Sequence, residues 1–218
     1  MPQNEVIVYT DGSALRNPAG PMGWAWWNML TDERNYGGAM MGTNNIGELS
    51  AVLDVLRFHR SVKNLVIRSD SQYAINCSTT WVKGWVVKGW RKADKKPVNN
   101  LALVRAIYDE IEYKKSQGGS VRFEWVKGHA GHKGNEICDT LAHGFSSQLD
   151  ELEKQASPAQ PRTAHAGLGQ ASQHIYRATE SGRMPLEGWA QLLHDGYIDS
   201  ADVDPQVITQ IEKYHFFE

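Results

Sequence analysis

The residues most suited to chemistry are acidic side chains that follow short apolar runs. Asp11 follows the β-favouring run Val6–Tyr9, and Asp70 follows a second such run, Leu65–Arg68. Ligands of α/β sheets bind beyond the carboxyl ends of strands, so two aspartates at two such ends are expected to lie close together. Paired carboxylates repel unless they bind a metal ion or share a proton, which favours an active site. The competing interpretation of Asp11 is a turn, because Asp-Gly is a common turn dipeptide.

Two more acidic residues lie near the expected starts of helices. Glu48 falls in the first turn of one helix, and Asp139 falls in the second turn of another that Asn135 is expected to cap. Each has a structural alternative. Glu48 lies three residues after Asn45 and can complete a capping box, and Asp139 can be a carboxylate that a helix N-terminus favours.

A loop at 127–134, reading K-G-H-A-G-H-K-G, immediately precedes the helix that carries Asp139. Its three glycines predict a mobile loop. His129 in this loop is suited to moving a proton or helping a product leave. His132 has no clear role, and a place on the loop surface is expected for it.

Four carboxylates around an open site form the donor set that a hard divalent cation such as Mg²⁺ prefers. Zinc is a poor fit, because Cys77 and Cys138 lack the spacing of metal ligands and no Cys/His cluster exists. Two hard ions about 3.5–4 Å apart can clamp the attacking and leaving oxygens of a phosphoryl displacement. The two cysteines are expected to be reduced core thiols of a cytosolic protein.

The segment 81–98 combines aromatic and basic side chains. It contains Trp81, Trp85 and Trp90, and its six basic residues are Lys83, Lys88, Arg91, Lys92, Lys95 and Lys96. Tryptophans at this spacing usually pack in a core, and a basic run usually forms a solvated face. Their combination on a segment broken by glycines favours a nucleic-acid surface, where rings contact sugars or bases and cations neutralise phosphates.

The elements that must position these side chains alternate between strand and helix patterns. Apolar residues with strand character predict strands at 6–11, 22–28, 35–41, 65–68 and 121–126, the second and third forming a hairpin. Apolar residues at three- and four-residue spacing predict helices at 43–56, 71–80, 100–115 and from Asn135 onwards.

The composition is that of a water-exposed globular protein with two unlike parts. Of 218 residues, 41% are hydrophobic and 22% are charged. Residues 1–150 carry 18 Lys and Arg against 15 Asp and Glu, a net charge of +3, whereas residues 151–218 carry 5 against 10, a net charge of −5. The first part is therefore expected to approach a polyanion and the second to be repelled by one. We expect no membrane span and no secretory signal, and a cytoplasmic location.

Five motifs together resemble bacterial type 1 ribonuclease H. They are Y-T-D-G-S at 9–13, T-N-N-I-G-E-L at 43–49, S-D-S-Q-Y at 69–73, A-D-K-K-P-V at 93–98, and W-V-K-G-H-A-G-H-K-G-N-E-I-C-D at 125–139. Their order and spacing match as well, and the resemblance covers residues 1–150 nearly end to end. It implies an α/β fold, a ribonuclease H-like five-stranded mixed sheet whose first three strands are antiparallel, with helices on both faces.

The resemblance implies an endonuclease that hydrolyses the RNA strand of RNA–DNA hybrids by a two-metal-ion mechanism. Mg²⁺, or Mn²⁺ as a substitute, would be the ion, and the products would carry 5′-phosphate and 3′-hydroxyl ends. The metal-binding carboxylates would be Asp11, Glu48, Asp70 and Asp139, with His129 as the catalytic residue of the loop. The nuclease domain is expected to be monomeric.

The resemblance also implies the substrate contacts. RNA 2′-hydroxyl groups, which distinguish RNA from DNA, would meet Gly12, Ser13, Asn17, Asn45 and Gln72. A phosphate of the DNA strand would meet Thr43 and Asn100, and DNA sugars or bases would meet Asn44, Trp81 and Trp85. The basic surface of the same segment would be completed by Trp90, Lys92, Lys95 and Lys96.

Three departures from the family pattern affect the placement of Glu48 and the strength of hybrid binding. Gly47 stands where relatives often have a larger residue, which bears on the placement of Glu48. Met41 replaces a frequent basic residue near the DNA phosphate pocket, and Val86-Val87 replaces more charged residues, so weaker and less salt-sensitive hybrid binding is expected. The alternatives are a hybrid-binding module without catalysis, and a member of the wider integrase and resolvase superfamily, which generally lacks the Trp/Lys segment and the K-G-H-A-G-H loop.

The last third of the chain is expected to be separate from the nuclease domain. Residues 151–173 are rich in Ala, Gln, Gly and Pro and predict a flexible linker. Residues 174–218 regain apolar content and predict a small acidic module of two or three helices, with Pro205 starting the last. A module of this size is marginal alone. Docking on the nuclease domain, self-association or binding of a protein partner is therefore its expected role.

Overall fold

A computed structural model describes residues 5–155 and 176–177 of the chain. Its elements, in chain order, are β1 (Glu5–Ala14), β2 (Gly20–Asn28), β3 (Arg34–Gly42), α1 (Asn44–Phe58), β4 (Asn64–Ser69), α2 (Gln72–Thr79), α3 (Trp81–Val87), α4 (Leu101–Ser116), β5 (Ser120–Trp125), α5 (Lys133–Gln155) and β6 (Tyr176–Arg177). None of the helices in these residues is long and apolar enough to cross a membrane.

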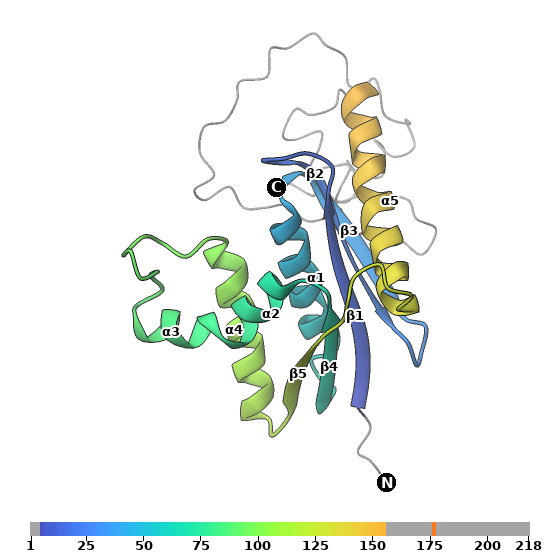
Figure 1. The fold of residues 1–218 in the computed structure, drawn as a ribbon. Helices are drawn as coiled ribbons and strands as arrows, with labels where there is room; N and C mark the ends of the chain where they lie inside the picture. Colours follow the sequence, from blue (N-terminus) through green and yellow to red (C-terminus); the bar gives the residue numbers. More distant parts are fainter. Residues whose placement is uncertain (1–4, 156–175, 178–218) are drawn as a thin grey trace, which may run out of the picture.

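The strands form one mixed sheet in the order β5-β4-β1-β2-β3-β6 (Figure 1). The first three strands are antiparallel neighbours, and β4 and β5 are added in parallel on the other side of β1. The predicted five-stranded sheet is therefore confirmed. The two-residue β6 pairs antiparallel with β3 as a further strand. It falls in the stretch for which helices were predicted, so that prediction is wrong for residues 176–177.

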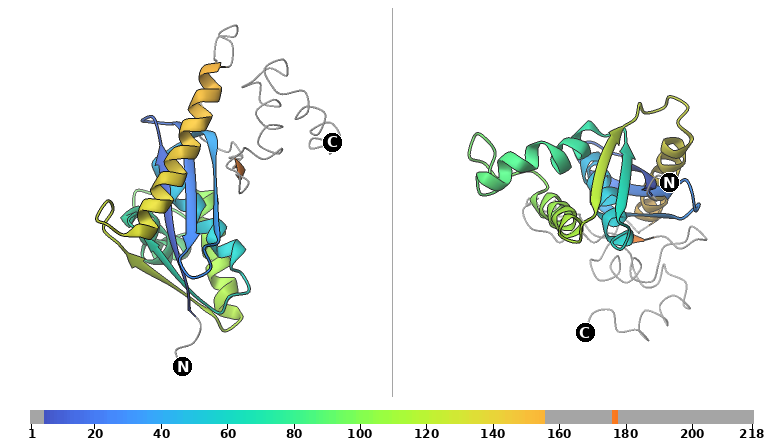
Figure 2. Two further views of the ribbon diagram at one scale, coloured as in Figure 1. Left: turned by 90° about the vertical axis from the view of Figure 1, so that its right-hand side faces the viewer. Right: turned by 90° about the horizontal axis from the view of Figure 1, so that it is seen from below.

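Helices cover both faces of this sheet, and the alternation of side chains along β2 shows it directly. Trp24 and Trp26 point into the core cluster beneath α1, whereas Ala25 and Trp27 belong to the cluster beneath α5. Figure 2 shows α5 running along one face while α1 and α4 lie on the other. Because both faces are covered, every residue of β2 is buried, and the run reads as continuously apolar in the sequence.

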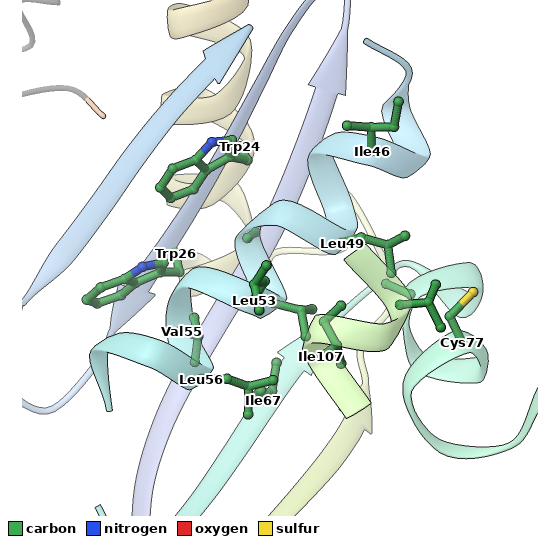
Figure 3. Close-up of a cluster of buried hydrophobic side chains, with 14 of the residues drawn as sticks. Trp24, Trp26, Ile46, Leu49, Leu53, Val55, Leu56, Ile67, Cys77 and Ile107 are labelled. Carbon is green, nitrogen blue, oxygen red and sulfur yellow. The ribbon is translucent and has the colours of Figure 1, made fainter. Parts of the chain in front are cut away.

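The larger core lies between the sheet and α1, with α2 and α4 closing it (Figure 3). One apolar side of α1 faces the sheet, where Leu49, Leu53 and Leu56 recur at helical spacing and are buried. Ile67 reaches this core from β4 and Ile107 from α4. The predicted amphipathic helices thus pack as their apolar spacing requires.

A buried lysine fastens α4 to the end of α1. Lys114 is 2% exposed, and its Nζ donates hydrogen bonds to the carbonyl oxygens of His59, Arg60 and Val62 at 2.8, 3.2 and 2.6 Å. Carbonyls just beyond a helix C-terminus lack intrahelical partners, and an ammonium group with three donors satisfies them. This side chain therefore fixes the turn that leads from α1 into β4.

The last helix is longer than the sequence predicts. α5 runs to Gln155, through the boundary predicted at 150, so the linker prediction is wrong for residues 151–155. The rest of the predicted linker and the remainder of the 174–218 module lie outside the described residues.

Candidate active site

The central pair of parallel strands brings the first two carboxylates together. In the register of β1 with β4, Thr10 lies opposite Ser69, so the residues that follow, Asp11 and Asp70, are neighbours. β1 continues to Ala14 and stays paired with β2. The expectation that β1 ends at Asp11 is therefore wrong, and so is the alternative of a turn there.

Glycines allow α1 to approach the sheet closely enough to place Glu48. A Cβ on Gly47 would lie 2.6 Å from the carbonyl oxygen of Gly23 and 3.1 Å from Cα of Gly12. A Cβ on Gly12 would collide with the backbone of residues 47 and 48. The backbones of α1, β1 and β2 therefore touch at this point, which leaves room for no side chain. Gly47, a departure from the family pattern, brings Glu48 to the strands.

The N-cap of α1 rules out the capping box between Asn45 and Glu48. Thr43 is the N-cap residue, and its Oγ1 accepts a hydrogen bond from the backbone N–H of Ile46 at 3.3 Å. The helix therefore begins two residues before the position that a capping box between Asn45 and Glu48 would need. Glu48 is 4% exposed and accepts a hydrogen bond of 3.5 Å from Nδ2 of Asn44.

Asp11, Glu48 and Asp70 form one compact acidic cluster. Each offers a carboxylate oxygen, and these oxygens lie within 4.8 Å of one another. Oε2 of Glu48 is buried and has no hydrogen-bond partner. Burial and the charge of Asp70 raise the pKa of Asp11 from 3.8 to about 7. Burial, followed by the charges of Asp11 and Asp70, raises the pKa of Glu48 well above its usual 4.5.

This donor set fits a divalent cation. Three carboxylates converge, one of their oxygens has no partner, and their like charges raise the pKa values of Asp11 and Glu48. A positive ion placed among them would offset the repulsion and give the unpartnered oxygen a partner. Oxygen donors without sulfur or imidazole in the cluster suit a hard ion. The cluster is thus able to hold a metal ion, as the spacing of the sequence predicts.

Asp139 lies outside this compact cluster. It projects from α5, and 43% of its side chain is exposed. Its negative charge still raises the pKa of Asp11, after burial and the charge of Asp70. Nδ1 of His129 lies 3.9 Å from Oδ2 of Asp139, and the histidine is 79% exposed. The structure therefore places Asp139 and His129 together at the open side of the site.

Three residues that hold Asp70 were not predicted from the sequence. Nδ2 of Asn135 donates a hydrogen bond of 3.0 Å to the Asp70 carboxylate, and Nε1 of Trp125 donates one of 3.1 Å to its backbone carbonyl. A Cβ on Gly128 would collide with the same carboxylate. The prediction that Asn135 caps the last helix is wrong, because α5 begins at Lys133. Gly128 and Asn135 both belong to the 125–139 motif, so the motif contained the sequence signal for these contacts.

Three of the residues expected to meet the RNA strand carry exposed amide side chains. Asn17, Asn45 and Gln72 are exposed, the last of them as the first residue of α2. Gly12 is buried in the contact with α1, and Ser13 is half-buried beside it. The three amides are therefore open to solvent, whereas the two residues of β1 serve the packing.

The tryptophans of the 81–98 segment are divided between the surface and the core. Trp81 is 42% exposed, and its ring contacts Tyr73 and Trp85 at centroid distances of 6.0 and 5.9 Å. Trp85 and Trp90 are half-buried against the main core, where Trp90 packs on Tyr108 at 5.7 Å. The core interpretation of the spacing therefore holds for Trp85 and Trp90, whereas the nucleic-acid interpretation stays a prediction, with the ring of Trp81 at the surface.

The polar residues of the same segment follow α3 in a series of turns. Lys95 and Lys96 are exposed and Lys92 is half-buried. Asn100, the residue before α4, donates a hydrogen bond of 3.0 Å from Nδ2 to the Tyr73 hydroxyl. Asn100 therefore ties the end of these turns to α2, and the lysines remain at the surface.

Comparisons with known proteins agree with this geometry. Residues 3–146 match the family model described as RNase H. The chain is 44% identical over 145 residues to a ribonuclease H of Tropheryma whipplei, an alignment that covers 65% of this chain and 84% of the relative. The crystal structure of LC9-RNase H1, a type 1 RNase H with the type 2 active-site motif, is 26% identical with a TM-score of 0.55, over 68% of this chain and 75% of that chain. A foamy viral protease-reverse transcriptase solved with an RNA/DNA hybrid shares the fold at a TM-score of 0.59 and 20% identity, over 67% of this chain and 20% of that chain.

Proposed function

This chain belongs to the RNase H family and is a ribonuclease H, and on that premise we propose that it hydrolyses the RNA strand of RNA–DNA hybrids with Mg²⁺, or with Mn²⁺ as a substitute. The observation that carries the proposal is the buried cluster of Asp11, Glu48 and Asp70 with its unpartnered oxygen. The hybrid bound to the foamy viral relative supports the same substrate class.

Asp11, Glu48, Asp70 and Asp139 would hold the metal. Two divalent ions, bound with substrate present, would activate the attacking water and stabilise the leaving 3′ oxygen, so that the products carry 5′-phosphate and 3′-hydroxyl ends. The protein fixes the donor oxygens in advance, because Asn135 and Trp125 hold Asp70 and the glycine contact holds Glu48. Asp139 completes the set from the exposed side.

Recognition of the RNA strand follows from the polar groups around this cluster. Asn17, Asn45 and Gln72 present amide donors and acceptors that can pair with 2′-hydroxyls, and the backbone of Gly12 and the hydroxyl of Ser13 lie next to Asp11. Only RNA carries the 2′-hydroxyl, so these contacts select the strand to be cut.

The second strand of the hybrid would lie along α3 and the turns that follow it. Trp81 offers an exposed ring for a deoxyribose, with Trp85 and Asn44 as neighbouring contacts, and Thr43 and Asn100 would hold a DNA phosphate. Further contacts to the backbone would come from Trp90, Lys92, Lys95 and Lys96. The lysines contribute mainly through counterion release, so hybrid affinity falls as salt rises.

His129 would assist the proton transfers or the release of product. It lies on the glycine loop with its ring exposed, beside Asp139. A residue in this position can approach a phosphate at the cluster and withdraw again without any rearrangement of the sheet.

The test is cleavage of a labelled RNA–DNA hybrid by the full chain in Mg²⁺ and in Mn²⁺. Asp70→Asn removes one charge but keeps an acceptor for Asn135, and we expect its activity to fall by at least about a hundredfold. Asp109→Asn, which changes an exposed carboxylate on α4, is the matched control and should cut normally. A parent chain that binds the hybrid but cuts it in neither metal would replace the enzyme with a hybrid-binding module.

Two further assignments accompany this function. Both cysteines, Cys77 and Cys138, are free and buried, which suits a reducing compartment, and we assign the protein to the cytoplasm. The nuclease domain, monomeric in this proposal, occupies the residues up to the end of α5. Self-association or binding of a protein partner is assigned to residues 174–218.

A further inference from the structure

The end of α5 lies beyond the segment that matches the family model, and it makes a contact of its own. The match ends at residue 146, whereas α5 continues to Gln155. Two acidic residues of this extension, Asp150 and Glu153, both accept hydrogen bonds from the guanidinium of Arg16. Their side chains are 14% and 8% exposed. The extension is therefore packed against the domain and is ion-paired to it.

Arg16 belongs to the loop that joins β1 to β2. This loop, residues 15–19, is closed by a backbone hydrogen bond of 3.1 Å from Leu15 to Pro21. The aliphatic stem of Arg16 crosses Gly20, where an added Cβ would lie 2.8 Å from Cβ of Arg16. The arginine thus spans the base of its own loop before it reaches α5.

The next residue of the loop, Asn17, is exposed and is one of the amides assigned to the RNA strand. Ser13, near the end of β1 that leads into this loop, is also linked to α5, since its Oγ accepts a hydrogen bond of 3.5 Å from Oγ of Ser146. One face of α5 therefore contacts Ser13 directly and, through Arg16, the residue before Asn17.

We propose that Arg16, Asp150 and Glu153 form a positioning device that holds the 15–19 loop in the conformation in which Asn17 meets the RNA strand. The inference rests on the proposed function, because it deepens the role of the same site. An exposed loop that is ordered in advance loses less conformational entropy on binding. Residues 147–155 then belong to the working nuclease, although they lie outside the family match.

The cleanest perturbation removes the carboxylates. Loss of Arg16 would leave two shielded acidic side chains facing each other, and the resulting repulsion would disturb α5 itself. In Asp150→Asn/Glu153→Gln the helix keeps its shape and Arg16 is left to water. Lys154→Met is the matched control, because Lys154 also pairs with Asp150, at 2.8 Å, but it does not reach the loop.

The experiment measures KM and kcat for hybrid cleavage by the full chain, well below the unfolding temperature. For Asp150→Asn/Glu153→Gln we expect KM to rise about three- to tenfold with kcat within about twofold of the parent, and no change for Lys154→Met. Asn17→Ala should raise KM as well. If the device acts through Asn17, the acidic substitutions should add almost nothing in the Asn17→Ala background. The proposal would be overturned if KM does not change in Asp150→Asn/Glu153→Gln, or if the increases in KM from these substitutions and from Asn17→Ala multiply when they are combined.

A second readout does not depend on cleavage. The Leu15 amide, bonded to Pro21, should exchange its hydrogen faster in Asp150→Asn/Glu153→Gln than in the parent or in Lys154→Met. Unchanged protection refutes the device whatever the enzyme does. Conversely, if exchange is faster in Asp150→Asn/Glu153→Gln but the parent cuts no hybrid, the positioning device stands and the proposed function is rejected.

Discussion

Asp11→Asn should make the metal-free protein more stable, even though it removes an active-site group. Asp11 is 6% exposed, and burial together with the charge of Asp70 raises its pKa from 3.8 to about 7. One pKa unit corresponds to about 1.4 kcal/mol, so the difference of about three units represents about 4 kcal/mol of unfavourable free energy at neutral to alkaline pH. Asparagine removes the charge and keeps an oxygen for the Gly12 N–H, which donates to Asp11 at 2.7 Å.

The hydrogen bond from the Gly12 N–H favours the charged carboxylate and lowers the pKa of Asp11, so the value of about 7 already includes it. The charge of Asp11 also raises the pKa of Glu48, so its removal relieves a second group as well. We therefore expect the free energy of unfolding to rise by about 4 kcal/mol at pH 8.

The dependence on pH has a definite sign. In the unfolded chain Asp11 loses its proton near pH 3.8, whereas in the folded protein it keeps it to about pH 7. Between these values the folded state binds the extra proton, so the parent becomes less stable as the pH rises through this window. The advantage of Asp11→Asn should accordingly be small at pH 4.5 and complete at pH 8.

Urea unfolding followed by tryptophan fluorescence, with a chelator present, measures this difference. Asp109→Asn, an exposed carboxylate on α4, is the control and should change the free energy of unfolding by less than about 0.5 kcal/mol. An Asp11→Asn protein no more stable than the parent at pH 8, or a gain independent of pH, would refute the electrostatic reasoning.

Three more predictions follow from the same contacts. Mg²⁺ at about a hundred times its dissociation constant should raise the free energy of unfolding of the parent by about 2.7 kcal/mol, and calorimetry should find far less for Asp11→Asn. Lys114→Met leaves the carbonyls of Arg60 and Val62 without this donor, and that of His59 with only the Val62 N–H, so it should lower the free energy of unfolding by about 3 kcal/mol in urea, whereas the exposed Lys115→Met should cost under about 0.5 kcal/mol. Gly47→Ala forces α1 away from the strands, so both Mg²⁺-induced stabilisation and hybrid cleavage should be largely lost while circular dichroism still reports a folded protein; cleavage at the parent rate would disprove the backbone contact.

The sequence predicts those parts of the fold in which local pattern and tertiary packing agree. The helix that carries Glu48 and the strands that lead to Asp11 and Asp70 are evident from apolar spacing alone, because each buries one continuous side or both faces. The same patterns indicate that Asp11 and Asp70 lie close together, although β1 continues past Asp11 to Ala14. Asp139 and His129 are candidates from their helix and glycine loop alone, and the family resemblance then gives them roles at the metal site.

The errors arise where a distant contact overrides a local preference. Asn135 has the side chain of a helix cap, but it bonds to Asp70, 65 residues earlier in the chain. Residues 151–155 have the pattern of a linker, but they continue α5, and Arg16 pairs with this end of the helix. No local pattern contains the partner in either of these cases.

The glycine contact between Gly12, Gly23 and Gly47 has a consequence for anyone who redesigns this protein. The height of α1 above the sheet is set by backbone touching backbone, so it does not depend on the sizes of the side chains packed farther along the helix. A library that varies the core leucines can therefore change stability over a wide range while the spacing of the carboxylates stays constant. Gly12 and Gly47 are the positions to leave unaltered, since a methyl group on either would push α1 away from the strands, whereas a Cβ on Gly23 would meet the Ala142 carbonyl of α5 on the other face of the sheet.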